Sequence, residues 1–124
     1  MNKELQQKLF DKFPTIYQLG KTPQDYFYWG IECGNGWFKL LWKLSEDLEK
    51  AGFEGQVTQV KEKYGSLRFY TTGADDVSQF LIDYAEEESG FICEICGRKG
   101  KLRDYGWLTT LCWFHYLKIM RRKM

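Results

Sequence analysis

The stretch that decides the fold is Cys93-Glu94-Ile95-Cys96-Gly97, which Cys112-Trp113-Phe114-His115 completes near the C-terminus. Zinc prefers four ligands arranged as a tetrahedron, and thiolate and imidazole are the groups that bind it best. The spacing of the first two cysteines allows a tight turn to aim both sulfurs at one point. Gly97 allows the backbone to turn back, because glycine tolerates positive φ. We therefore expect a single zinc ion, whose ligands are Cys93, Cys96, Cys112 and His115.

The segment between the two ligand pairs predicts how the metal site folds. A short hairpin is expected around Asp104-Tyr105-Gly106, and Thr109 or Thr110 can then cap a final helix. Cys112 and His115 would share one face of its first turn. The packed side of this helix is expected to contain Trp113, Leu117 and Met120. A cysteine-bearing turn, a hairpin and a ligand-bearing helix follow one another in this order in a treble-clef zinc finger. The segment therefore predicts a treble clef and not a ββα finger, whose second ligand pair is two histidines. Because protein side chains fill all four positions, the zinc is expected to be structural.

Three other interpretations of the cysteines compete with zinc. Four cysteines can form two disulfides, but in a reducing compartment a CxxC pair is more often a metal or redox site. A thioredoxin-like redox pair occurs in a βαβ setting, which the residues around Cys93 do not predict. The third is a thiol pair that binds nothing, together with a core histidine. Four ligand side chains at two matched spacings favour zinc over all three.

The body of the protein, residues 1–90, is predicted to be an α+β unit in which a small antiparallel sheet packs against helices. Hydrophobic residues recur at helical spacing in three segments. The three expected stripes are Leu5, Leu9, Phe10 and Phe13; Trp37, Leu41, Leu44 and Leu48; and Val77, Phe80, Leu81, Tyr84 and Ala85. Asn2 and either Asp75 or Asp76 are the expected caps of the first and third helices, and residues 26–33 are typical of a strand. The zinc finger, residues 91–124, is expected to pack on this body as one structural unit.

A β-hairpin is predicted over residues 57–72, with Gly65-Ser66 as its turn. In this register Lys63 lies opposite Arg68, a pair of like charges that is unfavourable unless an anion or the carboxylates of residues 86–88 lie nearby. Side chains alternate between the two faces of a strand. The face that packs on the helices would hold Val60, Tyr64, Leu67 and Phe69. The open face would hold Gln59, Lys61, Lys63, Arg68 and Tyr70.

Charge is distributed unevenly along the chain. The formal net charge is +1, yet residues 93–124 contain eight Lys or Arg side chains against Glu94 and Asp104, which gives this segment +6. Residues 1–92 therefore carry −5. A basic end on an acidic body favours a polyanionic partner, although a solvated charged surface gives the same pattern. The N-terminus is polar and no apolar run approaches membrane length, so we expect a soluble, cytoplasmic protein.

The sequence predicts a protein without enzymatic activity. Cys33 lies in a Cys-Gly-Asn-Gly setting, but a nucleophilic cysteine needs a base, and the single histidine of the chain is already a predicted zinc ligand. Nucleases that embed a treble clef need a histidine to activate water and further ligands for a catalytic metal. The pair Asp75-Asp76 is explained by helix capping, and no phosphate-binding glycine loop is present.

A set of distinctive motifs lies between residues 30 and 115. The motifs are Glu32-Cys33-Gly34-Asn35-Gly36-Trp37-Phe38, the run Gln59-Val60-Lys61-Glu62-Lys63-Tyr64-Gly65-Ser66-Leu67-Arg68-Phe69-Tyr70, Ala85-Glu86, Cys93-Glu94-Ile95-Cys96-Gly97 and Thr110-Leu111-Cys112. In these motifs the chain resembles a family of small, largely uncharacterised proteins found in phages, prophages and bacteria. The resemblance implies a phage or mobile-element setting, which would make the compartment a host cytoplasm, and it supplies no activity.

These features together predict a binding module. The leading hypothesis is nucleic-acid binding through the basic hairpin face and the basic finger, because cations beside an aromatic ring suit a stacked base over a phosphate track. The alternative is a phage-type protein that binds a host protein and modulates or inhibits it. The predicted binding residues are Lys61, Lys63, Arg68, Tyr70, Arg98, Lys99, Lys101 and Arg103.

Overall fold

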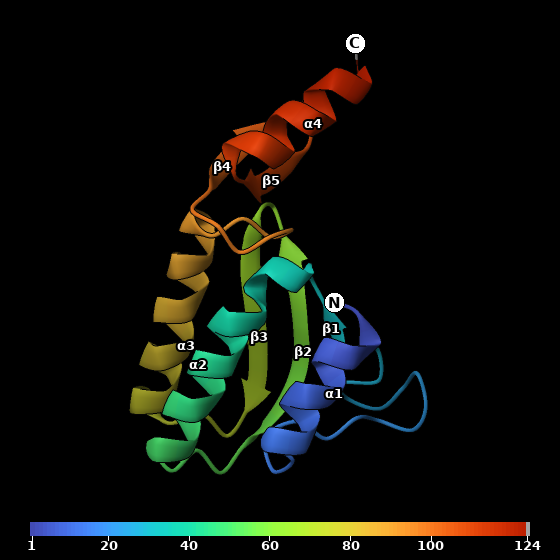
Figure 1. Cartoon of the computed structure of the whole chain (residues 1–124). Coiled ribbons are helices and arrows are strands. Elements are labelled where there is room, and N and C mark those ends of the chain that lie inside the picture. The colour runs from blue at the N-terminus through green and yellow to red at the C-terminus, as the bar shows by residue number, and fades with distance from the viewer. Residues whose placement is uncertain (124) are drawn as a thin grey trace.

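The computed structural model describes residues 1–123, which form a mixed α+β arrangement of four α-helices and two small sheets (Figure 1). The helices are α1 (Lys3–Lys12), α2 (Phe38–Lys50), α3 (Asp76–Glu88) and α4 (Trp113–Lys123). The main sheet contains β1 (Ile31–Glu32), β2 (Gln56–Lys63) and β3 (Ser66–Thr72), and the second sheet contains β4 (Lys101–Asp104) and β5 (Leu108–Leu111). Short 3₁₀ turns cover Asn35–Trp37 and Ser89–Phe91. Within residues 1–123, no helix combines the length and hydrophobicity that crossing a membrane requires.

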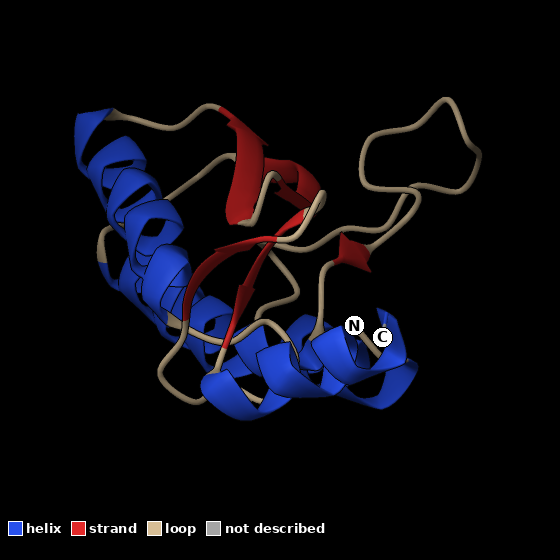
Figure 2. Cartoon of the chain, turned by 90° about the horizontal axis from the view of Figure 1, so that it is seen from above, coloured by secondary structure: helices blue, strands red, loops and turns tan. Residues whose placement is uncertain are grey.

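The main sheet is mixed rather than antiparallel throughout, which corrects the sequence prediction. β2 and β3 form the expected antiparallel hairpin, but β1 pairs with β2 in parallel and places Glu32 beside Lys61. The strand predicted over residues 26–33 is reduced to two residues, because Phe27 (φ 60) and Gly30 (φ 68) have left-handed backbones that an extended strand does not contain. The loop that replaces it projects from the side of the molecule beyond β1 (Figure 2).

The β2–β3 hairpin turns one residue earlier than predicted. Tyr64 (φ 54) and Gly65 (φ 84) form its two-residue loop. Both have positive φ, as a type I′ turn requires, and such turns favour glycine at the second central position. Lys61 therefore pairs with Arg68, and the predicted pairing of Lys63 with Arg68 is wrong. The shift also takes Tyr64 out of the packed face and leaves it 67% exposed.

Helices α1, α2 and α3 all lie on one side of the main sheet (Figure 1). Asn2 caps α1 as predicted, since its side-chain oxygen accepts a 2.9 Å hydrogen bond from the Leu5 N–H. The predicted stripe of α2 is confirmed. The buried core of this layer includes Leu9, Phe13, Trp37, Leu41, Leu44, Leu48, Val57, Val60, Leu67 and Phe69. No helix of residues 1–123 covers the opposite face of the sheet, which therefore stays open.

The face that helix α3 turns to the core matches the predicted stripe only at Leu81 and Ala85. Asp75 caps it as expected, but its buried residues are Ser78, Ile82 and Ala85, whereas Phe80 is 67% exposed. The other predicted core residues that lie outside are Val77 and Tyr84. Hydrogen bonds at the C-terminal end fix this rotation, because side chains there bond to the free edge of β3.

Helix α4 also differs from its prediction. Trp113 is 62% and Leu117 41% exposed, so the expected packed side is wrong. Tyr116 and Ile119 pack instead, against a small second core of Cys93, Leu111 and Cys112. The helix is rotated in this way because its first turn must present Cys112 and His115 to the other two cysteines, and Tyr116 and Ile119 continue that same face.

Candidate metal centre

The four predicted ligands come together at the start of the C-terminal unit. Cys93 and Cys96 lie in the turn after the 3₁₀ segment Ser89–Phe91, Cys112 follows β5, and His115 lies in the first turn of α4. The metal-binding atoms of these side chains all lie within 4.8 Å of one another. Residues that are widely separated in the sequence therefore converge on one point, as a metal ligand set does.

The distances between the ligand atoms fit a tetrahedral ion. The Sγ atoms of Cys96 and Cys112 are 3.7 Å apart, and the Nδ1 of His115 lies 3.7 Å from the Cys93 Sγ and 3.3 Å from the Cys112 Sγ. With bonds of about 2.3 Å, a tetrahedron of sulfurs has edges of about 3.8 Å. A disulfide requires sulfurs about 2.05 Å apart, so these side chains are not disulfide-bonded and could hold a metal ion. All four cysteines are free.

Backbone hydrogen bonds shape the turn that carries Cys93 and Cys96. The Gly97 N–H donates to the Cys93 carbonyl at 2.9 Å, and the Cys93 N–H donates to the Arg98 carbonyl at 2.7 Å. Gly97 has φ +81, the left-handed conformation for which the sequence supplies a glycine. The Glu94 N–H bonds to the carbonyl of Thr110 in β5 at 3.0 Å, which joins the first ligand pair to the strand that leads to the second.

Cys112 occupies the N-cap position of α4. Its Sγ accepts a 3.4 Å hydrogen bond from the backbone N–H of His115. Burial tends to raise the pKa of this thiol, but hydrogen bonds from His115 and the neighbouring ligand side chains lower the pKa to about 6. A thiolate that exists near neutral pH is the form that binds metal. The prediction of a threonine cap is wrong, because Thr109 and Thr110 both lie in β5.

The Gly-Asn-Gly turn before α2 docks directly on the metal-binding turn. The N–H groups of Gly34 and Gly36 donate to the side chain and the carbonyl of Glu94, at 2.8 and 2.7 Å. The indole N–H of Trp37 donates to the Ile92 carbonyl at 2.9 Å. A Cβ on Gly36 would overlap the backbone of residues 93–94. The two glycines that flank Asn35 indicated a turn in the sequence, but not the contact that this turn forms with residues 93–94.

A second contact joins the hairpin tip to the β4–β5 sheet. The Thr110 hydroxyl donates to the Gly65 carbonyl at 2.6 Å, and a Cβ on Gly65 would overlap Leu102. Figure 1 shows the same arrangement, with β4, β5 and α4 at the end of the molecule to which the hairpin points. The ligand-bearing segment thus touches the body at two separate places.

Cys33 lies outside the ligand cluster. Its side chain is 6% exposed, and burial, followed by the charge of Glu94, raises the pKa of the thiol to about 12. A thiol in this state is neither a metal ligand nor a nucleophile at neutral pH.

The structure divides the predicted binding residues into two groups. Lys61, Arg68 and Tyr70 share the open face of the main sheet, and the Lys61 ammonium lies 5.9 Å from the centre of the Tyr70 ring. Lys63 is exposed near the hairpin tip, 5.5 Å from the ring centre of Tyr64. The exposed cations of the C-terminal unit are Arg98, Lys99 and Lys101. None of these cations forms an ion pair within residues 1–123, where the one ion pair joins Lys43 and Asp47.

Arg103 packs against two rings of α4, and its predicted binding role stays a prediction. Its guanidinium lies 4.6 Å from the ring centre of Tyr116 and 5.4 Å from that of Trp113, and its Nε donates to the Leu111 carbonyl at 3.3 Å. These contacts hold β4 against α4, so Arg103 is a structural residue of the C-terminal unit.

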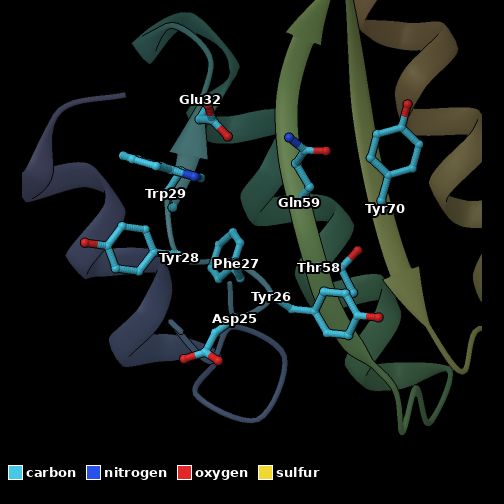
Figure 3. A pocket seen from close by; sticks show the side chains of 10 residues that line it. Asp25, Tyr26, Phe27, Tyr28, Trp29, Glu32, Thr58, Gln59 and Tyr70 are labelled. Atoms are coloured by element: carbon cyan, nitrogen blue, oxygen red, sulfur yellow. The ribbon is translucent and has the colours of Figure 1, made fainter. Parts of the chain in front are cut away.

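Sequence reasoning missed a hollow on the open face of the main sheet. It has a volume of about 400 Å³, and its lining includes Tyr26, Trp29, Gln59 and Tyr70 (Figure 3). The expected strand over residues 26–33 concealed it, because a strand would have alternated these rings between two faces.

Comparisons with protein-family models, with curated proteins and with solved structures find no match to this chain.

Proposed function

We propose that this protein is a non-enzymatic zinc-binding module that binds nucleic acid through the open face of its main sheet and its basic C-terminal finger. The observation that carries the proposal is the open face itself. Lys61 and Arg68 are cross-strand partners there, beside Tyr70 and in line with Lys63, and none of the three cations has an ion-pair partner within residues 1–123.

The cross-strand pair favours an anionic ligand. Like charges directly opposite each other on a sheet are destabilising, and an anion between them removes that cost. The Glu86 carboxylate gives partial relief on the side of Arg68 without forming an ion pair with it, and it accepts a 2.8 Å hydrogen bond from the Phe69 N–H at the strand edge. Burial raises the pKa of Glu86, against the opposing effects of that hydrogen bond and of Arg68. Glu32 lies beside Lys61 as its register partner in β1, and a phosphate on the open face would supply further negative charge between Lys61 and Arg68.

The metal is proposed to be zinc, in a structural role. Three thiolates and one imidazole form a ligand set typical of zinc, and a site filled by four protein ligands leaves no position for a reactive water. The ligand turn, the β4–β5 hairpin and α4 follow the order of a treble-clef finger, which we assign to residues 91–124. The finger would present Arg98, Lys99 and Lys101 to the same ligand.

Salt dependence tests this function. We expect the affinity for a fluorescein-labelled oligonucleotide, measured by anisotropy, to fall steeply with salt, because each neutralised phosphate releases counterions. The double variant Lys61→Gln/Arg68→Gln should weaken binding and lower the slope of log affinity against log salt by roughly one unit per lost contact. A matched control is Lys39→Gln/Lys50→Gln, which removes two exposed charges of α2. Equal affinities and slopes for both variants, or no binding at all, would refute the proposal.

The second candidate is binding to a host protein, in keeping with the resemblance to phage proteins. The observation that favours it is an apolar groove of about 380 Å³ between α2 and α3, where Phe80 and Tyr84 are exposed next to Leu40. An interface built on aromatic anchors is less sensitive to salt than a phosphate contact. Recovery of one host protein at high salt after nuclease treatment, lost in Phe80→Ala, would support this candidate instead.

A further inference from the structure

The hollow on the open face of the main sheet has the chemistry of a site for an unstacked base. We infer that it binds a nucleobase of a single strand, whose phosphates lie on the adjacent cations Lys61 and Arg68. The inference rests on the proposed function and adds the form of nucleic acid that is bound. The volume of about 400 Å³ lies within the roughly 300–1,000 Å³ that small-molecule sites span.

Aromatic rings surround the hollow. Tyr26 is 68%, Trp29 67% and Tyr70 43% exposed, so three large rings are left facing solvent on one surface. Figure 3 shows Trp29 and Tyr70 on opposite sides of Gln59, with Tyr26 below them next to Thr58. Exposed rings on a sheet surface are the platforms on which proteins stack the bases of single strands.

The backbone holds two of these rings in place. Phe27, which lies between Tyr26 and Trp29, is buried, and its N–H donates to the carbonyl of Thr58 at 2.8 Å. Thr58 has no partner in β3, because the pairing of β2 with β3 shifts by one residue between Val57 and Gln59. Gly30 closes the turn with a 3.4 Å hydrogen bond to the Phe27 carbonyl. The loop is thus anchored in its middle, and the two flanking rings are presented at fixed positions.

The charges inside the hollow decide which part of a nucleotide enters. Asp25 and Glu32 line it, so a phosphate would meet two carboxylates there. Asp25 stays ionised, because hydrogen bonds from the backbone of Thr22 and Lys21 lower its pKa. A neutral base meets no such repulsion, and its amino groups can donate to those oxygens. The cations lie just outside the hollow, where Lys61 is the register partner of Glu32.

A second aromatic cleft lies farther along β2 towards the hairpin tip. It has a volume of about 490 Å³, and its lining includes the rings of Tyr64 and Trp107 together with the charged Glu62 and Lys63. From Gln59 to Lys63 the strand rises by roughly 13 Å. A strand of several nucleotides can occupy both clefts with its phosphates over the cations between them. A duplex cannot, because its bases are stacked inside the helix.

Binding of matched single-stranded and duplex probes tests this inference. We would measure anisotropy of labelled ten-nucleotide DNA and RNA single strands and of the corresponding duplexes, with the full chain and the variants Trp29→Ala, Trp29→Phe and Phe80→Ala. Single strands should bind at least tenfold more tightly than duplexes, and Trp29→Ala should weaken them roughly tenfold. The salt slope should not change in Trp29→Ala, because the indole carries no charge. Trp29→Phe should retain most of the affinity. Phe80 is as exposed as Trp29 but lies on α3, so Phe80→Ala should have no effect.

The possible failures are distinct. Equal affinity for duplex and single strand, with no loss in Trp29→Ala, would overturn the base-binding inference and leave the proposed function standing. Absence of binding to every probe would overturn both. Equal losses of single-strand affinity in Trp29→Ala and Phe80→Ala would also overturn it, because they would show that a ring on the open face contributes no more to binding than a ring on α3. A loss in Trp29→Ala that Trp29→Phe does not restore would mean that the indole acts otherwise than by stacking.

Discussion

Gly36 is the residue on which the contact between the body and the metal-binding turn most directly depends. Its N–H donates to the Glu94 carbonyl, and the Cys93 carbonyl occupies the space where a Cβ would lie. Gly36→Ala should therefore push the two backbones apart and lower the free energy of unfolding by about 1–3 kcal/mol. Urea denaturation followed by circular dichroism measures this loss.

Gly90 provides the matched control for that substitution. No atom lies within 4 Å of a Cβ built on Gly90. Gly90→Ala should therefore leave the unfolding curve within about 0.5 kcal/mol of the original. The metal content of both variants should be unchanged, since neither touches a ligand side chain. Equal stability of the two variants would show that the Gly36 contact is unimportant.

At the scale of single residues, the sequence correctly predicted which four Cys and His side chains cluster, but it predicted the cross-strand partners in the hairpin poorly. Ligand pairs with two residues between their members are a local pattern, and Gly97 marks the turn that follows the first pair. The partner of Arg68 depends on which two residues form the turn, and a shift of one residue changes every cross-strand pair. The prediction placed Gly65 first in the turn, whereas it is the second of the two central residues. Type I′ turns favour glycine at that second position.

Among the elements, α3 shows why periodicity alone can select the wrong face. Its sequence offers an apolar stripe of Val77, Phe80 and Tyr84, and yet that stripe faces outward. The Ser89 hydroxyl just beyond the helix accepts a 2.9 Å hydrogen bond from the buried Leu67 N–H of β3. A buried N–H must be paired, so this polar contact adds to the burial of Ile82 and Ala85 in favouring the observed face. Such a long-range partner cannot be read from the local sequence.

Ser89→Ala tests the role of that hydrogen bond. Removal of the hydroxyl leaves the Leu67 N–H buried without a partner, and we expect the free energy of unfolding to fall by about 1–3 kcal/mol. Ser66→Ala is the comparison, because the Ser66 hydroxyl is exposed and forms only a 3.4 Å hydrogen bond to the Lys63 carbonyl. If urea denaturation gave equal losses for the two variants, the edge contact would not be what orients α3.

The loop of residues 26–30 and helix α4 are also oriented by residues that are distant in the sequence. The aromatic-rich segment of residues 26–33 predicted a strand, but the loop is fixed by the hydrogen bond from Phe27 to the carbonyl of Thr58 in β2. The rotation of α4 is fixed by the need to bring Cys112 and His115 to one point. Elements whose caps and stripes are local, such as α1 and α2, were predictable, whereas those oriented by distant partners were not.

At the scale of the whole molecule, the metal centre is connected to the body at two places. The turn at residues 34–36 bonds to Glu94, and the Thr110 hydroxyl bonds to the hairpin tip at Gly65. Loss of the metal should therefore destabilise the body as well as the finger. The formal charges of −5 on residues 1–92 and +6 on residues 93–124 also make the C-terminal segment the cationic part of the chain.

The most direct test of the central claim combines metal analysis with thermal unfolding of the purified chain. Mass spectrometry under native conditions should show one zinc ion per chain, since four ligands form a single closed site. Chelation should lower the melting temperature of the whole chain, because metal binding of this kind supplies folding free energy. Protein that contains no zinc as purified, binds none on addition and melts at the same temperature with or without chelator would contradict the account.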